Sequence, residues 1–252
     1  MTTKLSRKTL ASLPPNVAGP KYDRAALTPG ILHFGVGNFH RAHQAVYLDD
    51  LFNTGAGHDW GIVGAGVFAA ERAGRDRLAA QDWLSTVVEQ DERGRSARVT
   101  AAMIDFVEPA NASATIARLA DPRIRIVSLT ITEGGYFIAP ASGRFDPAHP
   151  GIVADAGDPA NPKTVFGLIL AGLVQRRRDG IVPFTVMSCD NIPHNGRVAA
   201  DAVIGLARLV DEDLAGWAGE HVAFPNAMVD RITPATTERE RAILADEFGL
   251  ED

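Results

Sequence analysis

Two glycines, Gly35 and Gly37, end an apolar run and lead directly into the helix-like segment 38–53. A tight turn at the first glycine and a bare backbone at the second let a pyrophosphate group approach the chain. The following helix offers free N–H groups at its positive end. This is the chemistry of a dinucleotide-binding turn. Two glycines after a strand also occur in ordinary strand-to-helix turns, so the pattern alone leaves both interpretations open.

A second glycine turn competes with the first. Gly64 and Gly66 also lie between a strand-like and a helix-like segment, and Ala69 gives this turn the better fit to the pattern G-x-G-x-x-A. Glu89 follows Gly64 by 25 residues, near the spacing of an acid that binds a ribose. The glycine pattern by itself does not separate the two turns.

Chain order favours the first turn. A dinucleotide-binding turn normally follows the first strand of the sheet, and the ribose-binding acid lies at the end of the second. We therefore expect Gly35 and Gly37 to hold the phosphates and Glu71 to lie near the adenosine ribose. The alternative for Glu71 is a solvated acid in the first turn of a helix, where the helix dipole favours a negative charge.

Three further polar residues, Glu133, Asn191 and Asp230, each come at the end of a strand-like segment. Open α/β sheets bind their ligands at the carboxyl ends of the strands. Taken singly, each residue has an ordinary explanation: a loop acid, an Asx turn before a helix cap, or a surface ion pair with Arg231. Their shared position favours a common cleft.

Other chemistry has little support in the sequence. His40 and His43 are three residues apart on one predicted helix, but no H-x-x-x-H motif or cysteine set joins them, so we expect no metal site. Ser188 lacks the G-x-S-x-G pattern of a nucleophilic serine. The lone Cys189 follows an apolar run, which favours a buried, inert thiol.

Strand-like and helix-like segments alternate along the chain. We expect strands over 31–36, 60–67, 84–89, 98–106, 124–131, 184–189 and 222–231, and helices over 38–53, 68–81, 110–120, 164–178, 195–214 and 236–248. Asn195 would be the N-cap of its helix, and residues 139–162 would form a long loop. This alternation predicts a doubly wound α/β sheet.

Composition fits a soluble globular protein with a sizeable core, since 46% of the residues are hydrophobic. We expect residues 1–29 to form an extension packed on a domain that occupies 30–252.

The net charge is −6, and the short basic run at 176–178 is typical of a solvated helix face. Nucleic acid is therefore not an expected partner. The single cysteine excludes an intrachain disulfide.

The beginning of the sequence lacks the apolar region of a secretory signal. No stretch reaches the roughly 18 apolar residues of a membrane span. We expect a cytoplasmic protein without membrane contact.

Five longer motifs carry a family resemblance. They are HFGVGNFHRAHQA (33–45), RIVSLTITEGGY (125–136), NPKTVFG (161–167), FTVMSCDNIPHNG (184–196) and FPNAMVDRITP (224–234). Through them the chain resembles the polyol-specific long-chain dehydrogenases over essentially its whole length. The resemblance implies a Rossmann-type domain that binds NAD, and it selects the first glycine turn.

The resemblance also implies which residues bind the cofactor. They are Gly35, Val36, Gly37, Asn38, Phe39, Arg41, Glu71 and Thr130. An acid at Glu71 suits NAD, because it would repel the 2′-phosphate of NADP.

The implied activity is metal-independent oxidation of a polyol secondary alcohol to a ketose, with hydride transfer to the nicotinamide. In the family a lysine is the general base. Asn191 matches an asparagine that binds the developing alkoxide, and Asp230 matches an acid that orients the lysine. Glu133 matches an acid that assists proton exchange with water. We expect D-mannitol and D-fructose as the substrate pair and a monomer as the assembly.

One part of the family pattern is missing. The family's lysine lies in a K-x-x-x-L-N-G-S/A-H type motif of a second, helical domain, and no such motif occurs in these 252 residues. The chain therefore resembles the N-terminal domain of a protein about twice as long. We expect it to bind NAD weakly and to turn over no polyol by itself.

The alternatives within the family are an arabinitol or sorbitol dehydrogenase and a hexuronate reductase. Outside it, the alternatives are a non-catalytic nucleotide-binding module and glycine turns with a purely structural role.

Overall fold

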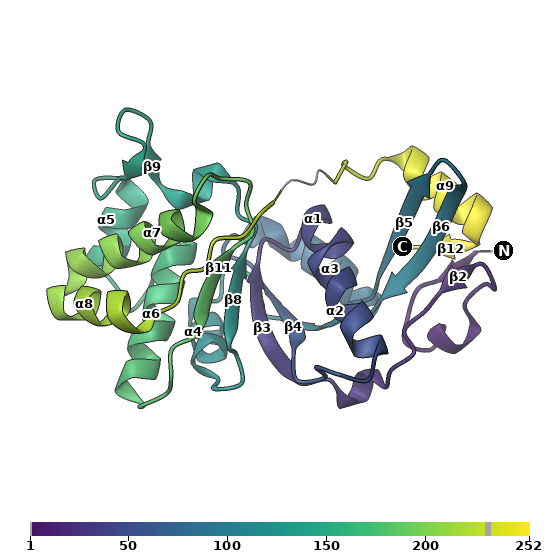
Figure 1. Ribbon diagram of the computed structural model, residues 1–252, viewed down its shortest axis with the longest axis horizontal. Helices are drawn as coiled ribbons and strands as arrows, with labels where there is room; N and C mark the ends of the chain where they lie inside the picture. The colour runs from purple at the N-terminus through teal and green to yellow at the C-terminus, as the bar shows by residue number, and fades with distance from the viewer. Residues whose placement is uncertain (1, 230–232) are drawn as a thin grey trace.

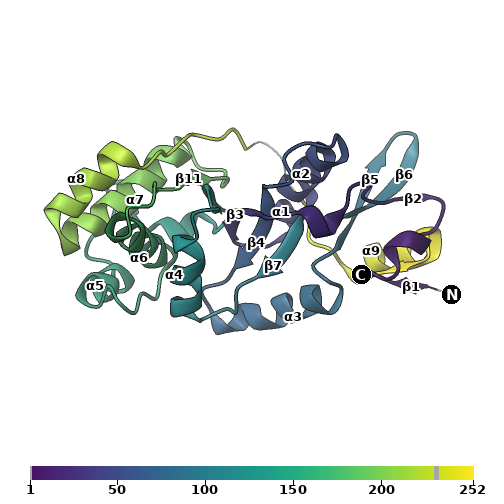
Figure 2. The ribbon, with the colours of Figure 1, turned by 90° about the horizontal axis from the view of Figure 1, so that it is seen from below.

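The centre of the molecule is a parallel sheet of five strands in the order β11-β8-β3-β4-β7 (Figure 1). The computed structural model describes residues 2–229 and 233–252. The five strands are β3 (Pro29–Phe34), β4 (Gly61–Ala65), β7 (Met103–Phe106), β8 (Ile126–Leu129) and β11 (Thr185–Ser188). Helices lie on both sides of this sheet (Figure 2), which explains why its strands are almost wholly apolar.

The sheet is built outward from its middle strand. From β3 the chain passes to β4 and β7 on one side, then crosses over to form β8 and β11 on the other. The crevice between β3 and β8, at their carboxyl ends, is where a doubly wound sheet binds ligands. The predicted Rossmann-type fold is confirmed.

The helices of this part of the chain follow the predicted alternation. They are α1 (Asn38–Ala42), α2 (Gln44–Asn53), α3 (Arg72–Ala80), α4 (Ala112–Ala120), α6 (Val165–Arg178), α7 (Asn195–Val210) and α8 (Glu212–His221). The last of them, α8, packs on α7 away from the sheet (Figure 1).

The basic run at the end of α6 is not wholly solvated as predicted, because Arg176 is 2% exposed. Its guanidinium donates to the backbone oxygens of Leu119, Val182 and Ile124.

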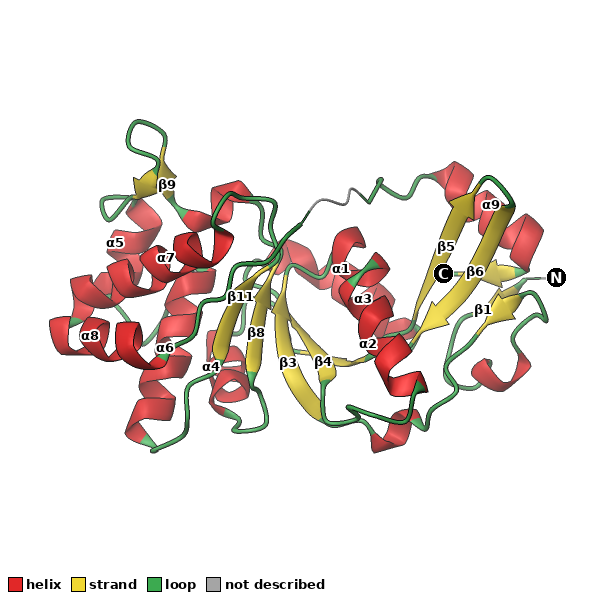
Figure 3. Ribbon diagram, in the orientation of Figure 1, coloured by secondary structure: helices red, strands yellow, loops and turns green. Residues whose placement is uncertain are grey.

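A smaller, three-stranded sheet lies near both ends of the chain (Figure 3). It contains β2 (Val17–Ala18), β6 (Gly94–Thr100) and β5 (Ser85–Asp91), and α9 (Glu238–Phe248) lies beside it. Next to it, β1 (Thr3–Lys4) pairs in parallel with β12 (Leu250–Glu251). Leu5, Leu84 and Leu250 are fully buried in a separate core here. The beginning and the end of the chain therefore stabilise one another.

Two predicted strands differ from the structure. The segment 98–106 is not one strand, because the chain leaves β6 and enters β7 of the other sheet at Ala101 and Ala102. Buried Asp49 and Arg24 hold this passage by bonding to Ala101 N and Ala101 O. The predicted strand 222–231 is not a strand over its described residues 222–229, although Val186 N donates to Ala223 O.

Two predicted helices are each divided into two. His43, with φ −126° and ψ −74°, leaves the helical conformation and separates α1 from α2. Asp211 is extended, and its carboxylate accepts the N–H groups of Asp213 and Leu214 as the N-cap of α8. A side chain that caps a new helix thus ends the predicted helix 195–214 early.

The predicted loop 139–162 contains regular structure. Short strands β9 (Ile138–Ala139) and β10 (Arg144–Phe145) pair antiparallel, and α5 (Pro150–Gly157) follows. Pro150 is compatible with the first turn of a helix, where its missing N–H needs no partner. Buried Asp155 then accepts bonds from Lys163 N and Thr164 N, which fixes α5 against the start of α6.

Candidate active site

The turn after β3 is closed by direct contact with the end of β8. Gly35 has a φ of +93°, and a Cβ atom on it would lie 2.0 Å from Thr130 O. Thr130 Oγ1 donates a hydrogen bond of 2.7 Å to Gly35 O. Only glycine fits here, since both the backbone angle and the contact exclude a side chain. Two residues predicted to bind the cofactor thus meet at the crevice between β3 and β8.

The outer side of the turn is open and carries a positive charge. Gly37 is exposed, and a Cβ atom on it would have Gly35 O, at 3.7 Å, as its nearest neighbour. Arg41 donates to Gly37 O through Nε and to Asn38 Oδ1 through Nη2, so its guanidinium is held beside the turn. Room and a fixed cation together suit a phosphate group.

Two other predicted residues of this stretch use their side chains elsewhere. Val36 packs against the core below the turn, and the Phe39 ring lies 4.7 Å from the His43 ring. The backbone N–H groups at the start of α1 are therefore what this stretch offers to an anion.

A buried polar network supports the turn from below. The rings of His33 and His40 stack with centroids 3.9 Å apart. His40 Nδ1 lies 2.9 Å from Gln44 Oε1, and Gln44 Nε2 donates to Ser128 Oγ. His33 Nδ1 lies 2.8 Å from Ser128 Oγ, and its Nε2 lies 3.2 Å from Gly35 O. These contacts form one chain of donors and acceptors. His40 Nδ1–H donates to Gln44, and Gln44 donates to Ser128. The Ser128 hydroxyl donates to His33 Nδ1, and His33 Nε2–H donates to Gly35 O, so one proton on each imidazole is enough.

Both imidazoles are neutral at pH 7 because burial disfavours their charged forms. Burial lowers the pKa of His40 to about 4 and holds the pKa of His33 well below its ordinary value. Sequence reasoning assigned these histidines no role beside the turn. The available signal was a polar residue, His33, in the otherwise apolar strand β3.

Glu71 lies just after β4, as predicted. Its Oε2 accepts the backbone N–H groups of Val67 and Phe68 at 2.8 and 2.7 Å. The carboxylate therefore fixes the turn that follows β4 and places a negative charge there. This position is the usual one for an acid beside an adenosine ribose.

The competing glycine turn has a packing explanation. Gly64 lies inside β4, and a Cβ atom on it would come within 2.7 Å of the Phe106 side chain and 2.8 Å of Met103. Glu89, the acid paired with that turn by spacing, is exposed on β5 of the small sheet. The structure thus supports the first turn and not the second.

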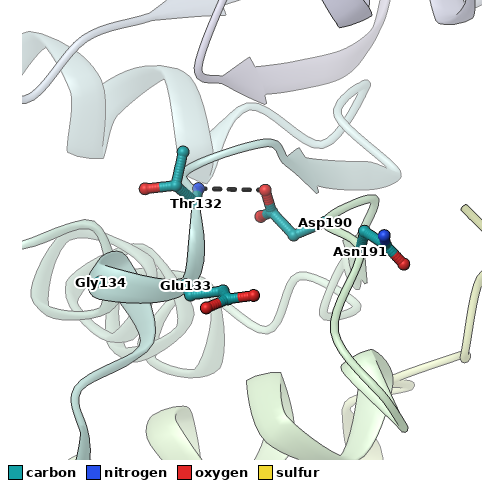
Figure 4. Close-up of a pocket in the computed structure, with 5 residues that line it drawn as sticks. All are labelled: Thr132, Glu133, Gly134, Asp190 and Asn191. Atoms are coloured by element: carbon teal, nitrogen blue, oxygen red, sulfur yellow. Dashed lines mark hydrogen bonds between the residues drawn. The ribbon is translucent and has the colours of Figure 1, made fainter. Parts of the chain in front are cut away.

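An open pocket of about 380 Å³ lies at the carboxyl ends of β8 and β11 (Figure 4). Its lining residues are Thr132, Glu133, Gly134, Asp190 and Asn191. Glu133 begins a short 3-10 turn, and its carboxylate extends toward the turn that carries Asp190 and Asn191. Two residues predicted to share a cleft, Glu133 and Asn191, therefore line the same pocket.

The third predicted polar segment is anchored beside this pocket. Asn195 Nδ2 donates to Asp190 O and Ala227 O, and Asn195 Oδ1 accepts from Ala227 N. Asn195 is thus not the N-cap of α7 as predicted; His194 has that position. The buried amide of Asn195 instead holds the chain that leads toward Asp230, which lies outside the described residues.

The polar groups follow the order of the strands along one edge of the sheet. Glu71 follows β4, Gly35 follows β3, Glu133 follows β8 and Asn191 follows β11, and these four strands are neighbours in that order. An extended ligand could place its phosphates at the middle strand. Its reacting end would then reach the pocket.

Nucleophilic and metal chemistry find little support among the described residues. Ser188 is buried and shares a 2.6 Å hydrogen bond with the Tyr136 hydroxyl, and burial raises the pKa of the Cys189 thiol to about 11. In residues 2–229 and 233–252, no three or more His, Cys, Asp or Glu side chains are grouped to hold a metal ion. No helix in these ranges is long and apolar enough to cross a membrane.

The motifs and the geometry agree with comparisons to known proteins. The family model for the mannitol dehydrogenase Rossmann domain matches residues 29–249. The chain belongs to this family. It is 63% identical to the mannitol 2-dehydrogenase of Cereibacter sphaeroides over 239 residues, which are 94% of this chain and 50% of that protein. It is 45% identical to the polyol:NADP oxidoreductase of Gluconobacter oxydans (strain 621H), covering 98% of this chain and 52% of that protein.

A solved structure is similar over nearly the whole chain. It is the Pseudomonas fluorescens mannitol 2-dehydrogenase in a ternary complex with NAD and D-mannitol, with a TM-score of 0.96 and 50% identity. The match covers 99% of this chain and 51% of that one. The chain thus spans about half the length of these relatives. The family resemblance predicted from the five motifs is confirmed.

Proposed function

We propose that this chain is the NAD-binding part of a polyol dehydrogenase that oxidises D-mannitol to D-fructose. The main support for the proposal is the close contact between Gly35 and Thr130 at the crevice between β3 and β8. This contact places the glycine turn beside a polar pocket. The ternary complex of the Pseudomonas fluorescens relative with NAD and D-mannitol supports both the cofactor and the substrate.

The residues present fit a dinucleotide. Gly37 leaves space above the turn that a Cβ atom would fill, and Arg41 supplies a cation beside it. When bound, NAD would accept a hydride from the substrate carbon. Thr130 holds the Gly35 carbonyl inward, so that the N–H groups at the start of α1 remain for the phosphates.

Glu71 favours NAD over NADP in this proposal. Its carboxylate is fixed beside the predicted ribose position by two backbone N–H groups, and a negative charge there repels a 2′-phosphate. Because the Gluconobacter oxydans relative is named for NADP, the preference needs a direct test. We expect NAD to bind at least about tenfold more tightly than NADP. A 2′-phosphate without a favourable partner at this position would weaken binding by more than about 1.4 kcal/mol, which corresponds to a tenfold change in affinity.

Asn191 and Glu133 would act at the reacting end. The Asn191 amide can donate a hydrogen bond to the oxygen of the substrate as it becomes an alkoxide. Glu133 would pass the released proton to water from the opposite side of the pocket. Asp230 would orient the general base.

The general base itself is not among the lysines of this chain. Lys4, Lys8, Lys21 and Lys163 are all exposed, and none of them lines the pocket. We infer that the base comes from the part of the complete protein that corresponds to the other half of the relatives.

The proposal is tested with the complete protein that contains this chain. We expect NAD-dependent oxidation of D-mannitol, with a larger kcat/KM than for arabinitol or sorbitol and than for NADH-dependent reduction of fructuronate. A larger kcat/KM for another of these substrates would replace D-mannitol within the same family. No NAD-dependent oxidation of any substrate in the panel would favour a non-catalytic nucleotide-binding module instead.

A further inference from the structure

The carboxylate of Asp190 joins the ends of two neighbouring strands. Asp190 follows β11, and its Oδ2 and Oδ1 accept the backbone N–H groups of Ile131 and Thr132, which follow β8, at 2.9 and 3.0 Å. The Tyr136 hydroxyl donates a third bond, of 2.7 Å, to Oδ2. Figure 4 shows the bond to Thr132 N across the top of the pocket. Both oxygens of this carboxylate are therefore engaged by the loop opposite.

The loop that Asp190 holds has a strained backbone. Thr132 has a φ of +64° and a ψ of 165°, a combination that glycine adopts freely and that other residues rarely adopt. Such a conformation persists only where surrounding contacts impose it. Three backbone bonds hold this conformation. Two are the N–H bonds to Asp190, one from Thr132 itself and one from the residue before it, and the third runs from Gly135 N to Thr132 O within the turn.

The strained residue lies directly before Glu133. A change in the Thr132 backbone angles would redirect the 3-10 turn that begins at Glu133 and would move its carboxylate away from the pocket. Asn191 follows Asp190 immediately, so the same carboxylate also fixes the distance between the two sides of the pocket.

We propose that Asp190 is a positioning residue that imposes the Thr132 conformation and thereby aims Glu133 at the side of the pocket opposite Asn191. This inference rests on the proposed dehydrogenase function, because it assigns Asp190 a part in the same site. Asp190 acts through the loop and not on the substrate. Its substitution should therefore lower kcat while leaving NAD binding unchanged.

The first test is Asp190→Asn in the complete protein. Whichever way the amide turns, its NH2 group faces a backbone N–H donor, so at least one of the two bonds to the loop is lost. We expect kcat for D-mannitol to fall about 10- to 100-fold, since displacements near 1 Å are enough for such losses. The dissociation constant for NAD should change by less than about twofold.

The decisive variant is the double change Asp190→Asn with Thr132→Gly. Glycine adopts the required angles without strain, so the loop no longer needs the carboxylate to hold that conformation. Relative to Thr132→Gly alone, we expect the loss of kcat caused by Asp190→Asn to shrink to about threefold or less. A merely structural role for Asp190 would not be rescued by removing strain at one exposed residue.

Tyr136→Phe is the matched control, because it removes one bond to Asp190 and keeps both backbone bonds. We expect its kcat to stay within about threefold of the unchanged protein. If Asp190→Asn does not yield folded protein, Asp190→Ser, which can accept one N–H bond, is measured with the same expected loss and the same rescue.

The outcomes separate the two proposals. An unchanged protein that fails to oxidise any polyol with NAD overturns the proposed function, and the inference about Asp190 falls with it. An active protein in which Asp190→Asn retains full kcat, or in which Thr132→Gly gives no rescue, overturns only the role of Asp190.

Discussion

Gly35 tolerates no side chain larger than a hydrogen atom. Its φ of +93° excludes any larger residue, and so does the distance of 2.0 Å that would separate an added Cβ from Thr130 O. Because Thr130 belongs to the neighbouring strand end, a side chain at Gly35 would separate β3 from β8 at the point where the cofactor is proposed to bind. We therefore expect the contacts between Gly35 and Thr130 to contribute both to stability and to cofactor binding.

We predict that Gly35→Ala lowers the free energy of unfolding by at least about 2 kcal/mol, from backbone strain and displacement of Thr130. Urea denaturation of the 252-residue chain measures this change. Gly216→Ala is the control, since a Cβ at this helical position would have no neighbour within 4 Å. It should leave stability unchanged or raise it slightly. Equal stability of the two variants would show that the contact with Thr130 is not formed.

The buried histidines make the stability of the chain depend on pH. The folded state holds His40 neutral down to a pKa of about 4, whereas an unfolded histidine takes up a proton near pH 6.5. Between these values the unfolded state binds more protons, so the free energy of unfolding decreases as the pH falls. The stability that neutral His40 contributes is fully present above about pH 6.5 and is lost progressively toward pH 4.

The measurement is the melting temperature of the chain at several pH values between 7 and 4. We predict that His40→Gln, which removes one of the two buried imidazoles, has a shallower decrease of melting temperature over this interval than the unchanged chain. Parallel curves for the two proteins would mean that other groups cause the pH dependence.

Sequence reasoning found residues that belong to a recognisable motif. It missed residues whose role depends on a hydrogen bond to a distant part of the chain. Gly35, Glu133 and Asn191 were predicted because each lies at the end of a strand-like segment. The links from His33 to Ser128 and from Asp190 to Thr132 could not be predicted in the same way. They depend on which strands are neighbours, and β3, β8 and β11 are far apart in the sequence.

At the scale of whole elements, hydrophobic periodicity predicted the parallel strands and failed where side chains interrupt an element. The helix 195–214 ends early because Asp211 caps α8, and the strand 98–106 is divided because Arg24 and Asp49 hold the passage between two sheets. The first interruption is a local N-cap, and the second comes from polar contacts between distant segments. A pattern of apolar residues contains neither of them.

Asn195 is the clearest case of such a contact between elements, because its buried amide bonds to Asp190 O and to both backbone groups of Ala227. We predict that Asn195→Ala lowers the free energy of unfolding by about 2–3 kcal/mol, since several buried backbone groups lose their partner. Urea denaturation checks this. Asn161→Ala, which removes an exposed bond to Asp158, should change stability by less than about 0.5 kcal/mol. A loss for Asn195→Ala as small as that of the control would contradict the anchoring role.

At the scale of the whole molecule, we propose that the chain holds the cofactor and lines one side of the reaction site. It spans about half the length of its relatives, and its four lysines are all exposed. We therefore assign binding to this chain and proton abstraction to the remainder of the complete protein.

Metal-independent chemistry is a further expectation for the complete protein. Hydride transfer with a lysine base and an amide at the alkoxide needs no Lewis acid. We predict that dialysis against EDTA, followed by assay in metal-free buffer, changes kcat for D-mannitol by less than about 20%, within the error of such assays. Loss of activity that added zinc restores would contradict this expectation.

The central claim is that NAD binds at the turn formed by Gly35 and Gly37. Its most direct test is calorimetric titration of NAD into the 252-residue chain and into Gly37→Ala, whose added Cβ meets no protein atom closer than 3.7 Å. We predict one NAD site in the unchanged chain. In the variant, which should have the same melting temperature, we predict at least about tenfold weaker binding, because the methyl group fills the space of the phosphates. Absence of binding to the unchanged chain, or equal affinity of the two proteins, would contradict the account.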